Sequence, residues 1–125
     1  MDNRDDYDIR VRVRSEYLPA QSGEGRYAFA YHVRIENAGM RSARLLSRHW
    51  VITNGNQQVQ EVRGDGVIGQ QPQIAPGEVY EYSSGAVLET PVGAMHGSYR
   101  MVGDDGTAFD AAIPAFTLAV PRALN

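Results

Sequence analysis

The segment Gly64-Asp65-Gly66-Val67-Ile68-Gly69 has residue types and spacing that could bind a ligand. Its G-x-G-x-x-G pattern occurs in dinucleotide-binding loops, where glycines let the backbone approach a pyrophosphate and the following helix points its N-terminus at the charge. Pro72 follows closely, and no strand-helix-strand pattern surrounds the string, so the context for dinucleotide binding is missing.

Two interpretations of this glycine-rich string stay open. Consecutive backbone N–H groups could bind an anion without a helix, or the glycines could simply permit positive φ in a long connection. In the first case the ligand would be a phosphorylated small molecule, and Arg63 would supply positive charge. The candidate ligand-binding residues are then Arg63, Gly64, Asp65, Gly66 and Gly69.

A second group with recognisable chemistry is a row of arginines near the N-terminus. Arg10, Arg12 and Arg14 alternate with apolar residues, which predicts that they share the solvent face of one strand. If the next strand pairs antiparallel, His32 and Arg34 join them in a candidate interaction face, where guanidinium groups can bind phosphates. The alternative is an ordinary solvated face, because any half-buried strand alternates in this way.

The remaining side chains offer no recognisable catalytic or metal-binding pattern. His32, His49 and His96 lack metal-ligand spacing, and Asp104-Asp105 sits between glycines in an expected turn, without the ligand series of a calcium loop. The sequence has no G-x-S-x-G motif, no cysteine and no lysine, which excludes thiolate nucleophiles, Schiff-base lysines and a P-loop lysine. We therefore expect a protein that is not an enzyme and has no cofactor and no metal site.

Length and charge indicate one globular domain with an uneven charge distribution. The 125 residues are enough to bury a core without disulfides, and the formal net charge is −3. Residues 10–50 hold eight arginines against three glutamates, whereas residues 51–125 hold three arginines against eight acidic residues. Any anionic partner should therefore be sought on the N-terminal strands. Nucleic acid is not expected, because the total charge is negative and the tyrosines fall mostly on core positions.

The termini and apolar stretches predict a cytoplasmic protein without membrane contact. The acidic N-terminus lacks the apolar segment of a signal peptide, and we expect residues 1–6 to be flexible. The stretch 111–120 is far shorter than the roughly 20 residues needed to cross a bilayer. The absence of cysteine agrees with a reducing compartment.

Alternation of apolar and polar residues predicts the elements that must position these side chains. No helical period is sustained, and Asn54-Gly55 is a strong hairpin signal. We expect an all-β, antiparallel two-sheet sandwich of fibronectin type III or immunoglobulin type, with seven or eight strands and little or no helix. The expected strands are 7–18, 27–36, 43–53, 57–62, 78–83, 97–102 and 107–120, with a loop over 64–77.

Two strands carry extra information. The third has apolar residues on both parities around Trp50, which favours a central strand partly covered on both faces, and Trp50 suits the buried core tryptophan of this fold. In the last strand the apolar residues are odd-numbered up to Ile113 and even-numbered from Phe116. This phase change predicts a bulge at Pro114-Ala115.

Nearly the whole chain, apart from the extreme N-terminus and the tail RALN, resembles the ApaG family as a single domain over 1–125. The resemblance rests on RHWVITNGNQQVQEVRGDGVIGQQPQIAPGEVYEYSSG (48–85) and PVGAMHGSYRMVGDDGTAFDAAIPAFTLAVP (91–121), with support from IRVRVRSEYL and YAFAYHVRIENAG. The run V-x-G-x-G-V-x-G-x-x-P, followed by P-G-E and a Y-x-S-G segment, is specific. It consists here of Val62, Gly64, Gly66, Val67, Gly69 and Pro72, then Pro76-Gly77-Glu78 and Tyr82-Ser83-Ser84-Gly85.

The resemblance implies a fibronectin type III-like sandwich and a bacterial context. The family is linked to operons with a diadenosine tetraphosphate hydrolase and to cobalt resistance and magnesium efflux, and related domains occur in F-box proteins and a DNA-polymerase-interacting protein. The expected function is a non-enzymatic binding module for an unidentified protein partner. The alternative is binding of a nucleotide or dinucleoside polyphosphate at 64–69. The sequence sets neither the partner's identity nor the oligomeric state.

Overall fold

The computed structural model describes residues 5–122 and is built almost entirely from β-strands. Within this range the only helical element is a three-residue 3-10 turn, and no helix is long and apolar enough to cross a membrane. The elements are β1 Ile9–Tyr17, η1 Pro19–Gln21, β2 Tyr27–Asn37, β3 Ala43–Asn54, β4 Val59–Asp65, β5 Gln73–Ile74, β6 Val79–Leu88, β7 Val92–Gly103 and β8 Ala108–Ala119.

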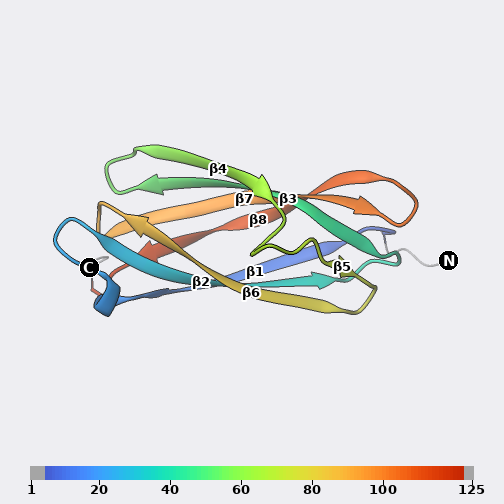
Figure 1. Cartoon of the computed structure of the whole chain (residues 1–125), viewed down its shortest axis with the longest axis horizontal. Coiled ribbons are helices and arrows are strands. Elements are labelled where there is room, and N and C mark those ends of the chain that lie inside the picture. Colours follow the sequence, from blue (N-terminus) through green and yellow to red (C-terminus); the bar gives the residue numbers. More distant parts are fainter. Residues whose placement is uncertain (1–4, 123–125) are drawn as a thin grey trace.

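The strands form two antiparallel sheets that face each other (Figure 1). The small sheet has the order β1-β2-β6, and the large sheet has the order β4-β3-β7-β8, with the short β5 also paired to β3. Both β4 and β5 lie along the same edge of β3, β4 opposite residues 47–53 and β5 opposite residues 43–44. The expected all-β sandwich of fibronectin type III-like architecture is confirmed.

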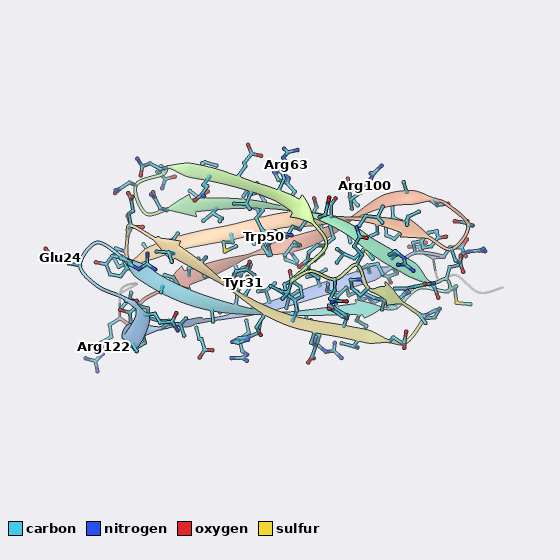
Figure 2. The ribbon with its side chains drawn as sticks, viewed as in Figure 1. Glu24, Tyr31, Trp50, Arg63, Arg100 and Arg122 are labelled. Carbon is cyan, nitrogen blue, oxygen red and sulfur yellow. The ribbon has the colours of Figure 1, made fainter. Side chains whose placement is uncertain are left out.

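The core lies between the sheets and is centred on aromatic side chains (Figure 2). Trp50 of β3 is only 2% exposed, which agrees with its predicted core role. Its indole meets the rings of Tyr31, Tyr99 and Phe116 edge to face, at centroid distances of 5.2, 6.5 and 5.9 Å. These contacts tie β2 of the small sheet to β3, β7 and β8 of the large one, and burial of this apolar area drives folding.

A bulge in β8 keeps both halves of the strand facing the core. Met95 pairs with Phe116 and Gly97 with Ile113, so the two residues Pro114 and Ala115 stand opposite one residue of β7. The predicted bulge at this position is confirmed. The extra residue restores the inward direction that alternation alone would have reversed.

A second bulge, in β3, corrects the interpretation of that strand. Leu45 pairs with Met101 and Ser47 with Arg100, which leaves Leu46 as an extra residue. Before the bulge the odd-numbered residues face the core, and after it the even-numbered residues do, Trp50 among them. The two apolar parities therefore arise from a change of phase.

Several boundaries also differ from the expected ones. β6 extends to Leu88 and β7 begins at Val92, because glycines that read as breaks lie inside these strands. Gly97 is required there, since a Cβ would lie 2.0 Å from the carbonyl oxygen of His49 on β3. Of the segment expected to be flexible, residues 1–4 lie outside the described range, and the Asp6 carbonyl accepts hydrogen bonds from two backbone amides of the 40–41 turn.

The two long sides of the sandwich differ. On one side β1 packs against β8, and the Ser15 hydroxyl donates to the Thr117 carbonyl at 2.8 Å. On the other side the edge strands β4 and β6 belong to different sheets, and hollows lined by residues of both sheets lie between them. The sandwich is thus closed along β1 and β8 and open along β4 and β6.

Candidate functional site

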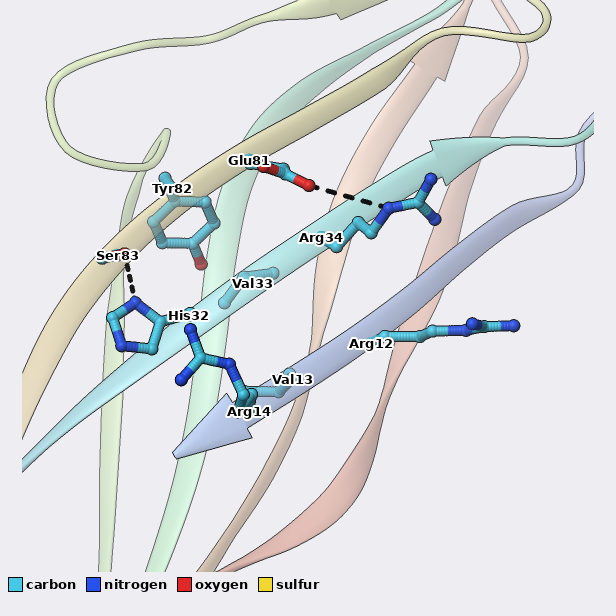
Figure 3. A pocket seen from close by; sticks show the side chains of 9 residues that line it. All are labelled: Arg12, Val13, Arg14, His32, Val33, Arg34, Glu81, Tyr82 and Ser83. Carbon is cyan, nitrogen blue, oxygen red and sulfur yellow. Dashed lines mark hydrogen bonds and ion pairs between the residues drawn. The ribbon is translucent and has the colours of Figure 1, made fainter. Parts of the chain in front are cut away.

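The outer face of the small sheet brings together most of the predicted interaction face (Figure 3). Strand pairing places Arg12 opposite Arg34 and Arg14 opposite His32. These four side chains, with residues of β6, line a shallow hollow of about 470 Å³. Arg10 lies farther along β1, opposite Glu36 and outside the lining.

Carboxylates offset much of the positive charge on this face. Arg10 pairs with Asp8 at 3.0 Å, and this neighbour raises the pKa of the guanidinium. Arg34 lies 3.2 Å from Glu36 and 3.6 Å from Glu81. The His32 ring contacts Glu16 through Nε2 at 2.8 Å and Ser83 through Nδ1 at 2.6 Å. The face is therefore a mixed-charge surface.

Arg12 and Arg14 are the exception on this face. Both are exposed, and neither makes an ion pair or side-chain hydrogen bond within residues 5–122. They are two positions apart in β1, about 6.6 Å along the strand. Their guanidinium donors are available to an anionic ligand, and a pair at this spacing can bind two acidic groups.

The glycine-rich string is a strand end followed by a tight turn. Gly64 still belongs to β4, and the Gly66 amide donates to the Leu46 carbonyl at 2.8 Å. Val67 and Gln70 exchange two backbone hydrogen bonds around Ile68-Gly69, which have φ of 46° and 73°. The amides of residues 66, 67 and 70 are thus already bonded within the protein, which favours a conformational role for the glycines.

A different arginine from the predicted one lies beside this string. Arg63 points out from the large sheet, is 72% exposed and pairs with Glu61 at 3.5 Å (Figure 2). Arg48 lies on the inner side, where its Nη1 donates to the carbonyls of Asp65 at 3.0 Å and Gly66 at 2.9 Å. A Cβ on Gly64 would lie 2.6 Å from the Arg48 guanidinium, so this glycine makes room for the arginine.

Sequence reasoning missed Arg48, although a signal was present. Arg48 has the same parity as Trp50 and Ile52, which places an arginine on the apolar side of β3. A cationic side chain at such a position is unusual, because burying a charge is costly without a polar partner. The carbonyls at 65 and 66 supply part of that compensation.

Arg48 is the centre of what we call the inter-sheet cleft, two adjoining hollows of about 390 and 240 Å³ on the open side of the sandwich. The hollows share Tyr31, Arg48 and Ser84. Tyr82 lines the smaller hollow, and its hydroxyl is hydrogen-bonded to that of Tyr99. Burial raises the pKa of Tyr82 to about 12 and that of Tyr99 further, so both phenols keep their protons at neutral pH.

The histidines are divided between the sheets, with His32 on β2 of the small sheet and His49 and His96 on the neighbouring strands β3 and β7 of the large one. His49 pairs with Glu61 at 2.8 Å on the outer face of the large sheet, and this hydrogen bond lowers the pKa of Glu61. Among the described residues no three or more histidine, aspartate or glutamate side chains gather in a group that could hold a metal ion.

Fold and surface together define a class, a fibronectin type III-like sandwich domain with a polar sheet face and a cleft between its sheets. The chain belongs to the ApaG domain family, whose model matches residues 18–103. It is 57% identical over 127 residues to Protein ApaG of Aromatoleum aromaticum, covering 100% of both chains. It is 60% identical over 121 residues to Protein ApaG of Pseudomonas paraeruginosa, covering 95% of this chain and 96% of the relative.

A solved structure agrees with this assignment. The crystal structure of an ApaA protein from Bordetella pertussis superimposes with a TM-score of 0.93 at 51% sequence identity. The match covers 96% of this chain and 99% of that one. The sandwich described here is therefore the family's fold over nearly its full length.

Proposed function

We propose that the chain is a non-enzymatic binding module that docks an acidic segment of a partner protein on the outer face of the small sheet. The observation that carries this proposal is the pair Arg12 and Arg14, exposed and without an acidic partner among the described residues. In an extended segment of the partner, two carboxylates that are two residues apart lie at the same spacing along the backbone as these two arginines. Each carboxylate can then face one guanidinium.

The family resemblance sets the proposed context of this binding. We place the module in the divalent-cation physiology, cobalt resistance or magnesium efflux, that the ApaG resemblance implies. A strain without the gene, complemented with the double variant Arg12→Glu/Arg14→Glu, should then tolerate cobalt less well than one complemented with the wild type. Equal tolerance at equal protein levels would contradict this context.

The binding proposal is tested with a purified partner. Affinity capture from native lysate identifies candidates, and calorimetry then measures the dissociation constant for the wild type and for Arg12→Glu/Arg14→Glu. Because charges at the rim of an interface act through salt-dependent attraction, we expect at least about tenfold weaker binding and a reduced salt dependence. The matched control, Arg63→Glu/Arg100→Glu, reverses two charges on the outer face of the large sheet and should leave binding unchanged.

Two results would contradict the docking proposal. One is a captured partner that binds the double variant as tightly as the wild type. The other is a partner whose affinity falls equally in the control variant, which would indicate general charge attraction.

The glycine-rich string remains the second candidate site, for a nucleotide or dinucleoside polyphosphate. Its bonded amides at residues 66, 67 and 70 leave few donors for a phosphate, so it has less support. Titration with ATP or diadenosine tetraphosphate should therefore produce no saturable shifts of the Gly64, Gly66 and Gly69 amide signals. Saturable shifts confined to these residues would make the glycine-rich string the better supported site, ahead of the outer face of the small sheet.

A further inference from the structure

We infer that the inter-sheet cleft is a separate binding site for a small carboxylate that carries an apolar body, with Arg48 binding the carboxylate. The site lies between β3, β4 and β6, on the open side of the sandwich and apart from the outer face that holds Arg12 and Arg14. It does not depend on the docking function proposed above.

The inter-sheet cleft holds polar groups without protein partners. Trp50 lines it, and its indole Nε1 is fully buried with no hydrogen-bond partner. The hydroxyls of Tyr31 and Ser84 make no hydrogen bond within the part of the chain that the structure describes. Of these groups only the indole donor is buried, and because buried donors are nearly always satisfied in folded proteins, Trp50 Nε1 indicates a missing acceptor. The two hydroxyls are open to the cleft and available to the same ligand.

The tyrosine pair behind the smaller hollow adds one more donor. Tyr82 and Tyr99 share one hydrogen bond, in which one hydroxyl donates and the other accepts. The accepting hydroxyl keeps a proton that no described group accepts. The larger hollow thus offers more donors than acceptors, the Gln60 amide oxygen aside, and it favours a ligand that brings acceptor oxygens. The Asp65 carboxylate lines only the smaller hollow.

Arg48 determines the charge of that ligand. Its Nη1 is used on two backbone carbonyls, which leaves Nη2 and Nε available, and it is the only charged side chain that lines the larger hollow. Asp65 lines the smaller hollow, but its carboxylate makes no ion pair with Arg48. A half-buried guanidinium with free donors is suited to a carboxylate or another oxyanion.

The walls of the larger hollow select the body of the ligand. Besides the rings of Tyr31 and Trp50, they consist mainly of aliphatic side chains, and the volume of about 390 Å³ is that of a small-molecule site. A bare phosphate would satisfy Arg48 but leave these walls against water. A carboxylate attached to a ring or a short alkyl chain would bind Arg48 and also cover the apolar walls. The aliphatic wall residues are Ile52, Val62, Ala86, Val87 and Met95.

The chain contains one tryptophan, so its single indole N–H signal reports directly on this site. We expect phenylacetate to shift that signal saturably in a titration followed by nitrogen-proton correlation spectra. Phenylacetamide, which lacks the charge, should bind at least about tenfold more weakly, because charge-assisted hydrogen bonds exceed neutral ones by that order. Inorganic phosphate should give no saturable shift.

Variants separate the roles of the groups. Arg48→Gln should weaken phenylacetate binding at least about tenfold. Because Arg48 also holds the 65–66 backbone, Tyr31→Phe provides a second test that removes only an unpartnered hydroxyl and should weaken binding several-fold. The control Arg63→Gln and the double variant Arg12→Glu/Arg14→Glu should bind phenylacetate like the wild type.

Any of four outcomes overturns the assignment. The indole signal could stay unmoved by millimolar phenylacetate, or move equally with phenylacetamide. Phosphate alone could give the saturable shift, which would make the cleft a phosphate site. Finally, both Arg48→Gln and Tyr31→Phe could keep wild-type affinity, which would place the ligand elsewhere.

Discussion

Ile68 holds a backbone conformation that β-branched residues rarely adopt. Its φ is 46°, in the left-handed region, and its side chain is 60% exposed, so little packing compensates the strain. The adjacent Val67 is almost fully buried in the core, and this anchor holds the turn in place. The strain at Ile68 is thus set by the turn that positions Val67.

Replacing Ile68 with asparagine should therefore stabilise the protein. Asparagine tolerates positive φ, and relief of the strain is worth about 1 kcal/mol in the free energy of unfolding, measured in urea. The control is Val59→Asn, at a position that is 62% exposed but lies in a strand, and it should lower stability slightly. A loss of stability in Ile68→Asn would contradict this account of the turn.

Asn37 is a fully buried polar residue with every side-chain atom in use. Its Nδ2 donates to the carbonyls of Arg41 at 2.9 Å and Ile74 at 2.8 Å, and its Oδ1 accepts from the Gly39 amide at 2.9 Å. The side chain thus joins the end of β2 to the following turn and to β5. Its removal leaves buried backbone groups without partners.

We expect Asn37→Ala to lower the free energy of unfolding by about 3 kcal/mol, the sum of several lost buried hydrogen bonds. Asn54, whose amide also bonds backbone and side-chain groups but at an exposed hairpin, provides the comparison. Asn54→Ala should cost about 1 kcal/mol. Similar losses for the two variants in urea unfolding would show that burial does not matter here.

At this scale the sequence predicts which residue faces outward better than which residue binds. Alternation correctly put Arg12, Arg14, His32 and Arg34 on one face, because side-chain direction in a strand follows parity. It did not show the carboxylates that neutralise part of this face, since some come from β6. Arg48 was missed because apolar residues occur on both parities around Trp50, so parity did not mark one side of the strand as the core side.

Among the elements, β7 and β3 leave no room for a side chain at Gly97. The Cβ of any other residue there would meet the His49 carbonyl at 2.0 Å, and a backbone oxygen in a central strand cannot move aside easily. Gly85 in β6 is different, because its nearest neighbour would be 3.4 Å away. Gly97 and Gly85 are therefore a matched pair of strand glycines, one without and one with room for a Cβ.

Gly97→Ala should therefore destabilise the sandwich by about 3 kcal/mol through overpacking and a shifted strand. Gly85→Ala should be neutral or slightly stabilising, because alanine restricts the unfolded chain. Thermal unfolding followed by circular dichroism measures both. If the two alanine variants melt together, the close approach of β7 to β3 is not required for the fold.

The strands were more predictable than their irregularities. The bulge at Pro114-Ala115 could be predicted because apolar parity reverses across a proline. The bulge at Leu46 could not, since apolar residues on both parities are equally typical of a strand covered on two faces. The short β5 was read as loop, because two residues are too few to show a period.

For the whole molecule, the segment before β1 is tied to the β7–β8 turn. The ring of Tyr7 stacks on Phe109 at 4.8 Å, and its hydroxyl donates to the Asp105 carboxylate. That hydrogen bond, with a second from Thr107, lowers the pKa of Asp105 to about 2. Arg41 pairs with the neighbouring Asp104 at 2.7 Å.

This link predicts a pH dependence of stability. A carboxylate whose pKa is lowered on folding stabilises the native state above its unfolded pKa, near 4, and loses that contribution as the pH falls toward 2. Asp105→Asn should therefore melt below the wild type at pH 7, and the two melting temperatures should converge near pH 2. Tyr7→Phe removes the largest cause of the pKa shift and should flatten the wild type's dependence in the same range. A difference between wild type and Asp105→Asn that is constant from pH 7 to 2 would contradict this prediction.

The closed side of the sandwich has a mechanical consequence. β1 and β8 lie side by side and run in the same direction, so the start of β1 and the end of β8 lie at opposite ends of the long axis (Figure 1). Tension applied through domains fused at both ends would load the β1–β8 contact in shear along its whole length. Its interactions would then bear the force together, whereas a hairpin pulled at its open end separates one pair at a time.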